Sequence, residues 1–91
     1  MYRIIHDLEG ATIKKLIQDV KLGKNIQNIR IQKSMSQADV VVKLQLLGSH
    51  LSLGHYAHIE QDRNNINVSD LIYLQRIFEV DFSEFFKDLI P

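Results

Sequence analysis

The sequence predicts an all-α fold, a compact domain of five packed helices preceded by a short N-terminal extension. Apolar residues recur at steps of three and four positions, which is the spacing of one helix face. Helix-start signals follow one another along the chain, and the only proline is the last residue, Pro91. The 91 residues, of which 45% are hydrophobic and 24% charged, suit a single modest core.

The extension is expected to cover residues 1–21. Residues 2–5 are apolar enough to form a strand, an arm or a frayed end, and Thr12 could cap a helix that continues through Val20. Gly23 separates this possible helix from the next one, and the domain itself is expected to span residues 22–91.

The first two helices of the domain are indicated by their apolar faces. Leu22, Ile26 and Ile29 define the first helix. Ser36 followed by Asp39 predicts a capped start for the second helix, which should run to about Leu46. The apolar face of this second helix is expected to consist of Val40, Val41, Leu44 and Leu47.

The remaining three helices follow at short intervals. Gly48 and Ser49 break the chain before a third helix, whose inward residues are Tyr56 and Ile59. Residues 62–65 are typical of a loop. A fourth helix is predicted to begin after the cap Asn67, with Asp70 in its first turn, and to end near Phe78. A fifth is predicted to begin after the cap Asp81, with Glu84 in its first turn, and to end at about Leu89.

Charge is unevenly distributed although the formal net charge is zero. Residues 14–33 hold six basic residues and one acidic residue, a net of +5, whereas residues 66–91 hold two basic and five acidic residues, a net of −3. One basic end can still orient a DNA-binding face, with a shallower salt dependence than that of a strongly basic protein. No signal peptide or membrane span is evident, so a cytoplasmic protein is expected.

Residues 22–86 resemble the lambda-repressor-like, Cro/XRE-type helix-turn-helix family. The resemblance is carried by the segments LGKNIQNIRIQKSMSQADVV, HYAHIEQDRNN and VSDLIYLQRIFEVDFSEFF. Its most specific residues are Gly23, Ile26, Arg30, Met35, Ser36, Gln37, Ile59, Glu60, Val80, Glu84, Phe85 and Phe86.

The resemblance implies roles for individual residues. Arg30 would form a structural ion pair with Glu60, and Gln37 would contact the DNA backbone from the start of the second helix. The recognition helix would begin at Ser52 and present Leu53, Gly54, His55 and His58 to the major groove. After that helix, the residues near the flanking phosphates would be Gln61, Arg63, Asn64 and Asn65.

Two features depart from the family pattern. The spacing from Gln37 to Glu60 is longer than usual, with the excess in KLQLLGSHLS. The recognition helix also begins without the Arg, Asn or Gln side chains that make paired contacts to bases. Sequence readout would therefore be weak or partly indirect, through the shape of the DNA.

The same residues allow other interpretations. His50, His55 and His58 are spaced like metal ligands, but no cysteine or acid completes a site, so neither a metal nor a cofactor is expected. Tyr56 is expected in the core and not stacked on a base. The aromatic cluster could be core, dimer face or ligand pocket, and its members are Phe78, Phe82, Phe85 and Phe86. No nucleophile elbow, phosphate loop or protease motif is present, which argues against an enzyme.

The sequence is therefore expected to encode a sequence-specific transcriptional regulator of bacterial or phage origin, acting as a repressor. It would bind operator DNA as a homodimer, with dimer contacts from the Phe-rich last helix or the N-terminal extension. The alternative is a protein-interaction module of the same fold, antitoxin-like or anti-repressor, with a weakened DNA face. The net charge of −1 over residues 36–65 favours this alternative.

Overall fold

The computed structural model describes residues 19–89, which form four α-helices and one 3₁₀-helix with no strand. The elements are α2 (Gly23–Gln32), α3 (Gln37–Leu46), α4 (Leu53–Glu60), α5 (Val68–Phe78) and the 3₁₀-helix η2 (Phe82–Phe86). The all-helical prediction is confirmed for these residues. The helix proposed from Thr12 lies mostly outside them, and Val20, at its expected end, is not helical.

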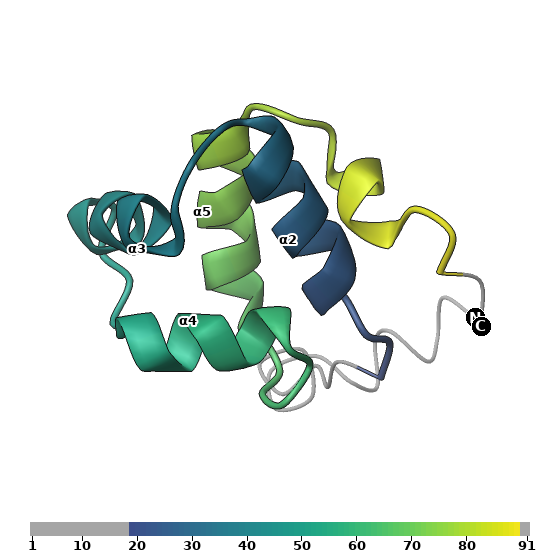
Figure 1. The fold of residues 1–91 in the computed structure, drawn as a ribbon, viewed down its shortest axis with the longest axis horizontal. Coiled ribbons are helices and arrows are strands. Elements are labelled where there is room, and N and C mark those ends of the chain that lie inside the picture. Colours follow the sequence, from purple (N-terminus) through teal and green to yellow (C-terminus); the bar gives the residue numbers. More distant parts are fainter. Residues whose placement is uncertain (1–18, 90–91) are drawn as a thin grey trace, which may run out of the picture.

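The helices surround one core (Figure 1). α2 and α5 occupy the centre of the view, α3 lies at the left, α4 crosses below them, and η2 packs on α2 at the right. The fully buried side chains come from every one of these elements, and they are Ile26, Val40, Leu44, Tyr56, Leu74, Phe78 and Phe85. The helical spacing that predicted the core is confirmed for these residues, but the prediction is wrong for Leu47, which is 38% exposed after the end of α3.

The prediction of five α-helices is wrong at the last element. η2 is a five-residue 3₁₀-helix that ends at Phe86 and does not reach Leu89. Lys87 leaves the helical region, with φ −60° and ψ 129°. The side-chain amide of Asn25 donates to the carbonyl oxygens of Phe85 and Lys87, both at 2.9 Å. These carbonyls are thus satisfied from α2, so an α-helical continuation is not needed to pair them.

Candidate nucleic-acid interface

α3 and α4 are consecutive helices joined by a turn, and a serine caps each of them. The Ser36 hydroxyl accepts from the Asp39 amide and the Asp39 carboxylate accepts from the Ser36 amide, both at 3.0 Å. The predicted capped start is therefore confirmed, in the form of a capping box. At the start of α4 the Ser52 hydroxyl accepts from the His55 amide at 3.2 Å. The two caps fix where each helix begins.

The turn between these helices is also ordered by polar contacts. The Ser49 hydroxyl, on a buried residue, accepts from the Leu51 amide at 3.1 Å, and the Gln45 side chain donates to the Leu51 carbonyl at 3.0 Å. Gly48 has a φ of 109°, a conformation that favours glycine. Of the segment KLQLLGSHLS, residues 43–46 thus extend α3, and residues 47–52 form a defined turn that leads into α4.

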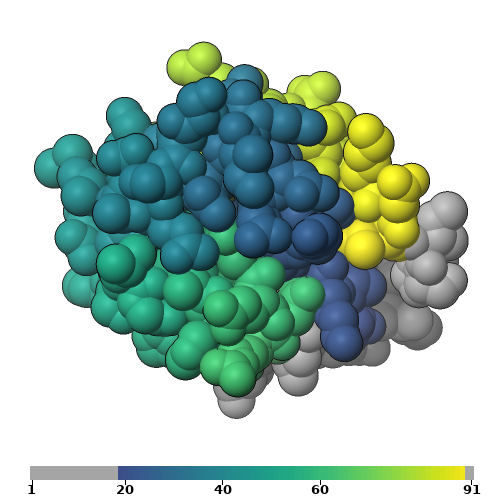
Figure 2. Space-filling model, in the orientation of Figure 1, coloured from purple at the N-terminus to yellow at the C-terminus, as the bar shows by residue number. Residues whose placement is uncertain are grey.

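The predicted DNA-reading residues form the solvent-facing side of α4 and its cap. Leu53 is 48% exposed, and a Cβ added to Gly54 would meet nothing within 4 Å. Figure 2 shows α3 and α4 forming the left and lower parts of one face, with α5 almost hidden behind. The exposed residues are Ser52, Leu53, Gly54, His55 and His58, whereas Tyr56, Ile59 and Glu60 turn inward.

The residues predicted to lie near phosphates follow the other end of α4. Gln61, Arg63 and Asn65 are exposed, and Asn64 is partly buried. The amide of Arg63 donates to the His58 carbonyl at 2.9 Å, which folds the chain back beneath the helix end. Since α4 has eight residues, this group lies roughly 12 Å along the helix from Leu53.

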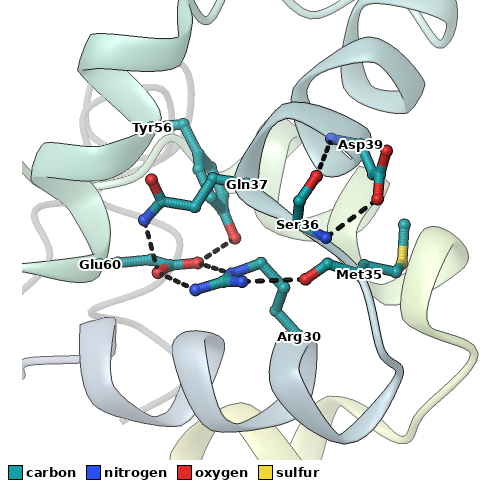
Figure 3. Close-up of polar contacts among 7 residues, drawn as sticks. All are labelled: Arg30, Met35, Ser36, Gln37, Asp39, Tyr56 and Glu60. Carbon is teal, nitrogen blue, oxygen red and sulfur yellow. Dashed lines mark hydrogen bonds and ion pairs between the residues drawn. The ribbon is translucent and has the colours of Figure 1, made fainter.

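Glu60 connects three helices (Figure 3). Its carboxylate accepts from Arg30 of α2 at 2.7 and 3.0 Å, a two-point contact in which the Glu60 side chain is 1% exposed. Gln37 of α3 donates to the same carboxylate at 2.9 Å and Tyr56 of α4 donates at 2.5 Å. Arg30 also donates to the Met35 carbonyl at 2.9 Å. The ion pair implied by the resemblance is therefore present, within a larger cluster.

The cluster determines the charge states of its members. Burial would raise the pKa of Glu60, but the hydrogen bonds from Arg30, Tyr56 and Gln37 outweigh burial and hold that pKa below its usual value. The hydrogen bond to Glu60 raises the pKa of Arg30. Burial, together with donation to Glu60, raises the pKa of the Tyr56 hydroxyl. Glu60 is thus a carboxylate and Tyr56 a neutral phenol at neutral pH.

The positions of Gln37 and Tyr56 refine the sequence-based interpretation. Gln37 is partly buried, and one hydrogen of its amide nitrogen is directed at Glu60, so its contact with a phosphate would use the second hydrogen and stays a prediction. Tyr56 is 0% exposed, which confirms its placement in the core.

Asp62 has a role that the sequence pattern did not indicate. Its carboxylate accepts from the Gly23 amide at 2.9 Å, while Leu22, at the N-cap position of α2, has no side-chain cap. A residue in the loop after α4 therefore caps a helix 39 positions earlier. Local spacing contains no signal for such a contact.

Neither a metal centre nor a membrane span is found in the described part of the chain. Within residues 19–89, no three His, Cys, Asp or Glu side chains are grouped so as to hold a metal ion. No helix among these residues has the length and apolar content to cross a bilayer. Comparison with protein-family models, with curated proteins and with solved structures finds no match to this chain.

Proposed function

We propose that this chain is a DNA-binding transcriptional regulator that acts as a repressor, with α4 as its reading helix. The observation that carries the proposal is the exposed side of α4, which stands beside α3 and has no neighbour within 4 Å of the Gly54 Cβ position. A helix that enters the major groove needs such an unobstructed first turn.

The charges around α4 support an anionic ligand. Residues 49–59 contain no acidic side chain, and the first turn of α4 contains none either. The positive end of the helix dipole is therefore not offset by a local carboxylate. Glu60 is buried against Arg30, and Asp62 is bound to the Gly23 amide. Arg63 is an exposed cation that suits a phosphate.

The protein-interaction module is the second candidate, and Leu53 favours it. This side chain is 48% exposed at the start of α4, where a base-reading protein more often has a polar group. A Leu at this position suits a thymine methyl group or an apolar patch of a protein.

The first experiment is selection of bound fragments from sheared DNA of the source genome at low salt, followed by fluorescence anisotropy on the enriched duplex. We expect an enriched palindrome and a dissociation constant that rises with salt. Arg63→Ala should weaken binding to all sequences and reduce the salt slope by about one. Lys87→Ala, which removes an exposed charge from the end of η2, is the matched control and should change neither quantity.

Recovery of no DNA at all would refute the proposal and favour the interaction module. If the Arg63 and Lys87 substitutions had equal effects on binding, α4 and the loop that follows it would not be part of the surface that contacts DNA.

A further inference from the structure

An open groove lies between the last turns of α3 and α5, away from the predicted DNA face. Its volume is about 350 Å³, and it is lined by Lys43, Leu46, Leu47, Arg76, Ile77 and Glu79. Leu46 is 81% exposed, the highest value among the large hydrophobic side chains of residues 19–89. No lining residue belongs to the exposed side of α4.

The apolar surface continues from the groove along α5. Val68 is 52% exposed and Ile72 is 42% exposed. Positions 68, 72 and 76 of α5 are four residues apart, so they share one helix face. The opposite face of α5 holds the buried residues Asp70, Leu74 and Phe78. The outer face of α5 therefore leaves the apolar side chains of Val68 and Ile72 about half exposed, which is typical of an interaction surface.

The charges of the groove indicate what covers it. Arg76, on the outer face of α5, and Glu79, the C-cap residue that follows α5, have opposite signs, and both line the groove. In a two-fold symmetric contact, Arg76 of each copy would face Glu79 of the other copy, so that both pairs have opposite charges. We propose that a second copy of this chain docks in the groove, with Leu46 and Ile77 at the centre and Arg76 beside Glu79 of the partner subunit.

The Phe-rich end of the chain is less suited to contact with a second copy, judged by its exposed apolar surface and by the signs of the charges around it. Phe82 and Phe86 are 43% and 44% exposed, but the exposed charged residues around them are Asp81, Glu84, Lys87 and Asp88. Three acids and one base on a self-contacting surface would place like charges together, at a cost in free energy. The groove between α3 and α5 presents both signs and more exposed apolar surface at Leu46.

The test is sedimentation velocity of the full chain without DNA over a wide range of protein concentration. We expect a monomer–dimer equilibrium, with the dissociation constant raised about tenfold or more by Leu46→Glu, since tenfold is about 1.4 kcal/mol. Ile31→Glu alters a side chain that is 58% exposed on α2, outside the groove, and is the matched control. It should leave the equilibrium unchanged.

A charge exchange makes the test independent of folding defects. Arg76→Glu and Glu79→Arg should each weaken the dimer, because each places two like charges across the two-fold axis. A mixture of the two single variants should associate, and the double variant should recover the dimer. A wild-type chain that remains monomeric, a dimer insensitive to Leu46→Glu, or failure of the exchange to restore association would overturn the proposal. None of these results depends on whether the chain binds DNA.

Discussion

Glu60 illustrates how one buried carboxylate orients the candidate reading helix. Its partners come from α2, α3 and α4, so the last turn of α4 is joined to both helices that pack against it. A buried charge is tolerated when its opposite charge and hydrogen bonds surround it, as Arg30, Gln37 and Tyr56 do here. The exposed residues of α4 therefore stand on a helix whose other side is fixed.

Glu60 should make stability depend on pH in the acid range. Because its pKa is lower in the folded protein than the ordinary value of 4.5, the unfolded chain takes up a proton first as the pH falls. The stabilisation is complete above that ordinary value and is lost as the pH falls through the folded-state pKa. Urea unfolding at a series of pH values should show the free energy of unfolding decreasing below about pH 4.5.

The Glu60→Gln variant tests whether protonation of Glu60 causes this loss of stability at acid pH. It should lower the free energy of unfolding at neutral pH by roughly 3–5 kcal/mol, the range for breaking a buried ion pair. Its decrease in stability below about pH 4.5 should be shallower than that of the wild type. Parallel pH profiles for the two proteins would show that another carboxylate is responsible.

Gly23 should be intolerant of a side chain. A Cβ at this position would lie 2.5 Å from the Glu60 carbonyl oxygen and 2.6 Å from that of Ile59, and both are backbone atoms. We expect Gly23→Ala to destabilise the protein by about 1–3 kcal/mol in thermal or urea unfolding. Gly54→Ala is the control, because open space surrounds that position in another helix. It should be neutral or stabilising by up to about 1 kcal/mol, and a similar result for Gly23→Ala would disprove the close contact.

At the scale of the element, the helix starts show what local sequence encodes. Ser36, Asn67 and Asp81 all occupy the N-cap positions predicted for them, and α3 and α5 end at the predicted residues. Only Ser36 makes the predicted side-chain bond, whereas Asn67 and Asp81 make none. Residue type therefore indicated where a helix begins, but the rotamer that completes a cap depends on surrounding packing.

This difference can be measured by alanine substitution. Ser36→Ala should lower the free energy of unfolding by about 1 kcal/mol, because the Asp39 amide loses its acceptor at the first turn of α3. Asn67→Ala should have a distinctly smaller effect, since its side chain accepts no cap bond. Equal losses in the two variants would show that the polar residue stabilises both starts in another way.

At the scale of the whole molecule, the apolar spacing was sufficient for the helical class and for most of the inward faces, and the family resemblance implied the pairing of Arg30 with Glu60. It was insufficient for contacts between distant segments, such as Asp62 with Gly23 or Asn25 with the end of η2. Helical periodicity is a local property, whereas these contacts depend on how the helices dock. The same limit explains why Gln37 was not expected beside Glu60, whereas the contact of Tyr56 with Glu60, four positions apart on α4, is one that local spacing could have indicated.

The cap supplied by Asp62 has a consequence for the order of folding. The first turn of α2 gains its acceptor only after the chain has closed a loop of about forty residues and α4 has docked. α2 and α4 are therefore expected to become stable together, as one cooperative unit. The amide of Gly23 reports this event directly, because its hydrogen is protected from exchange with solvent only while Asp62 is in place.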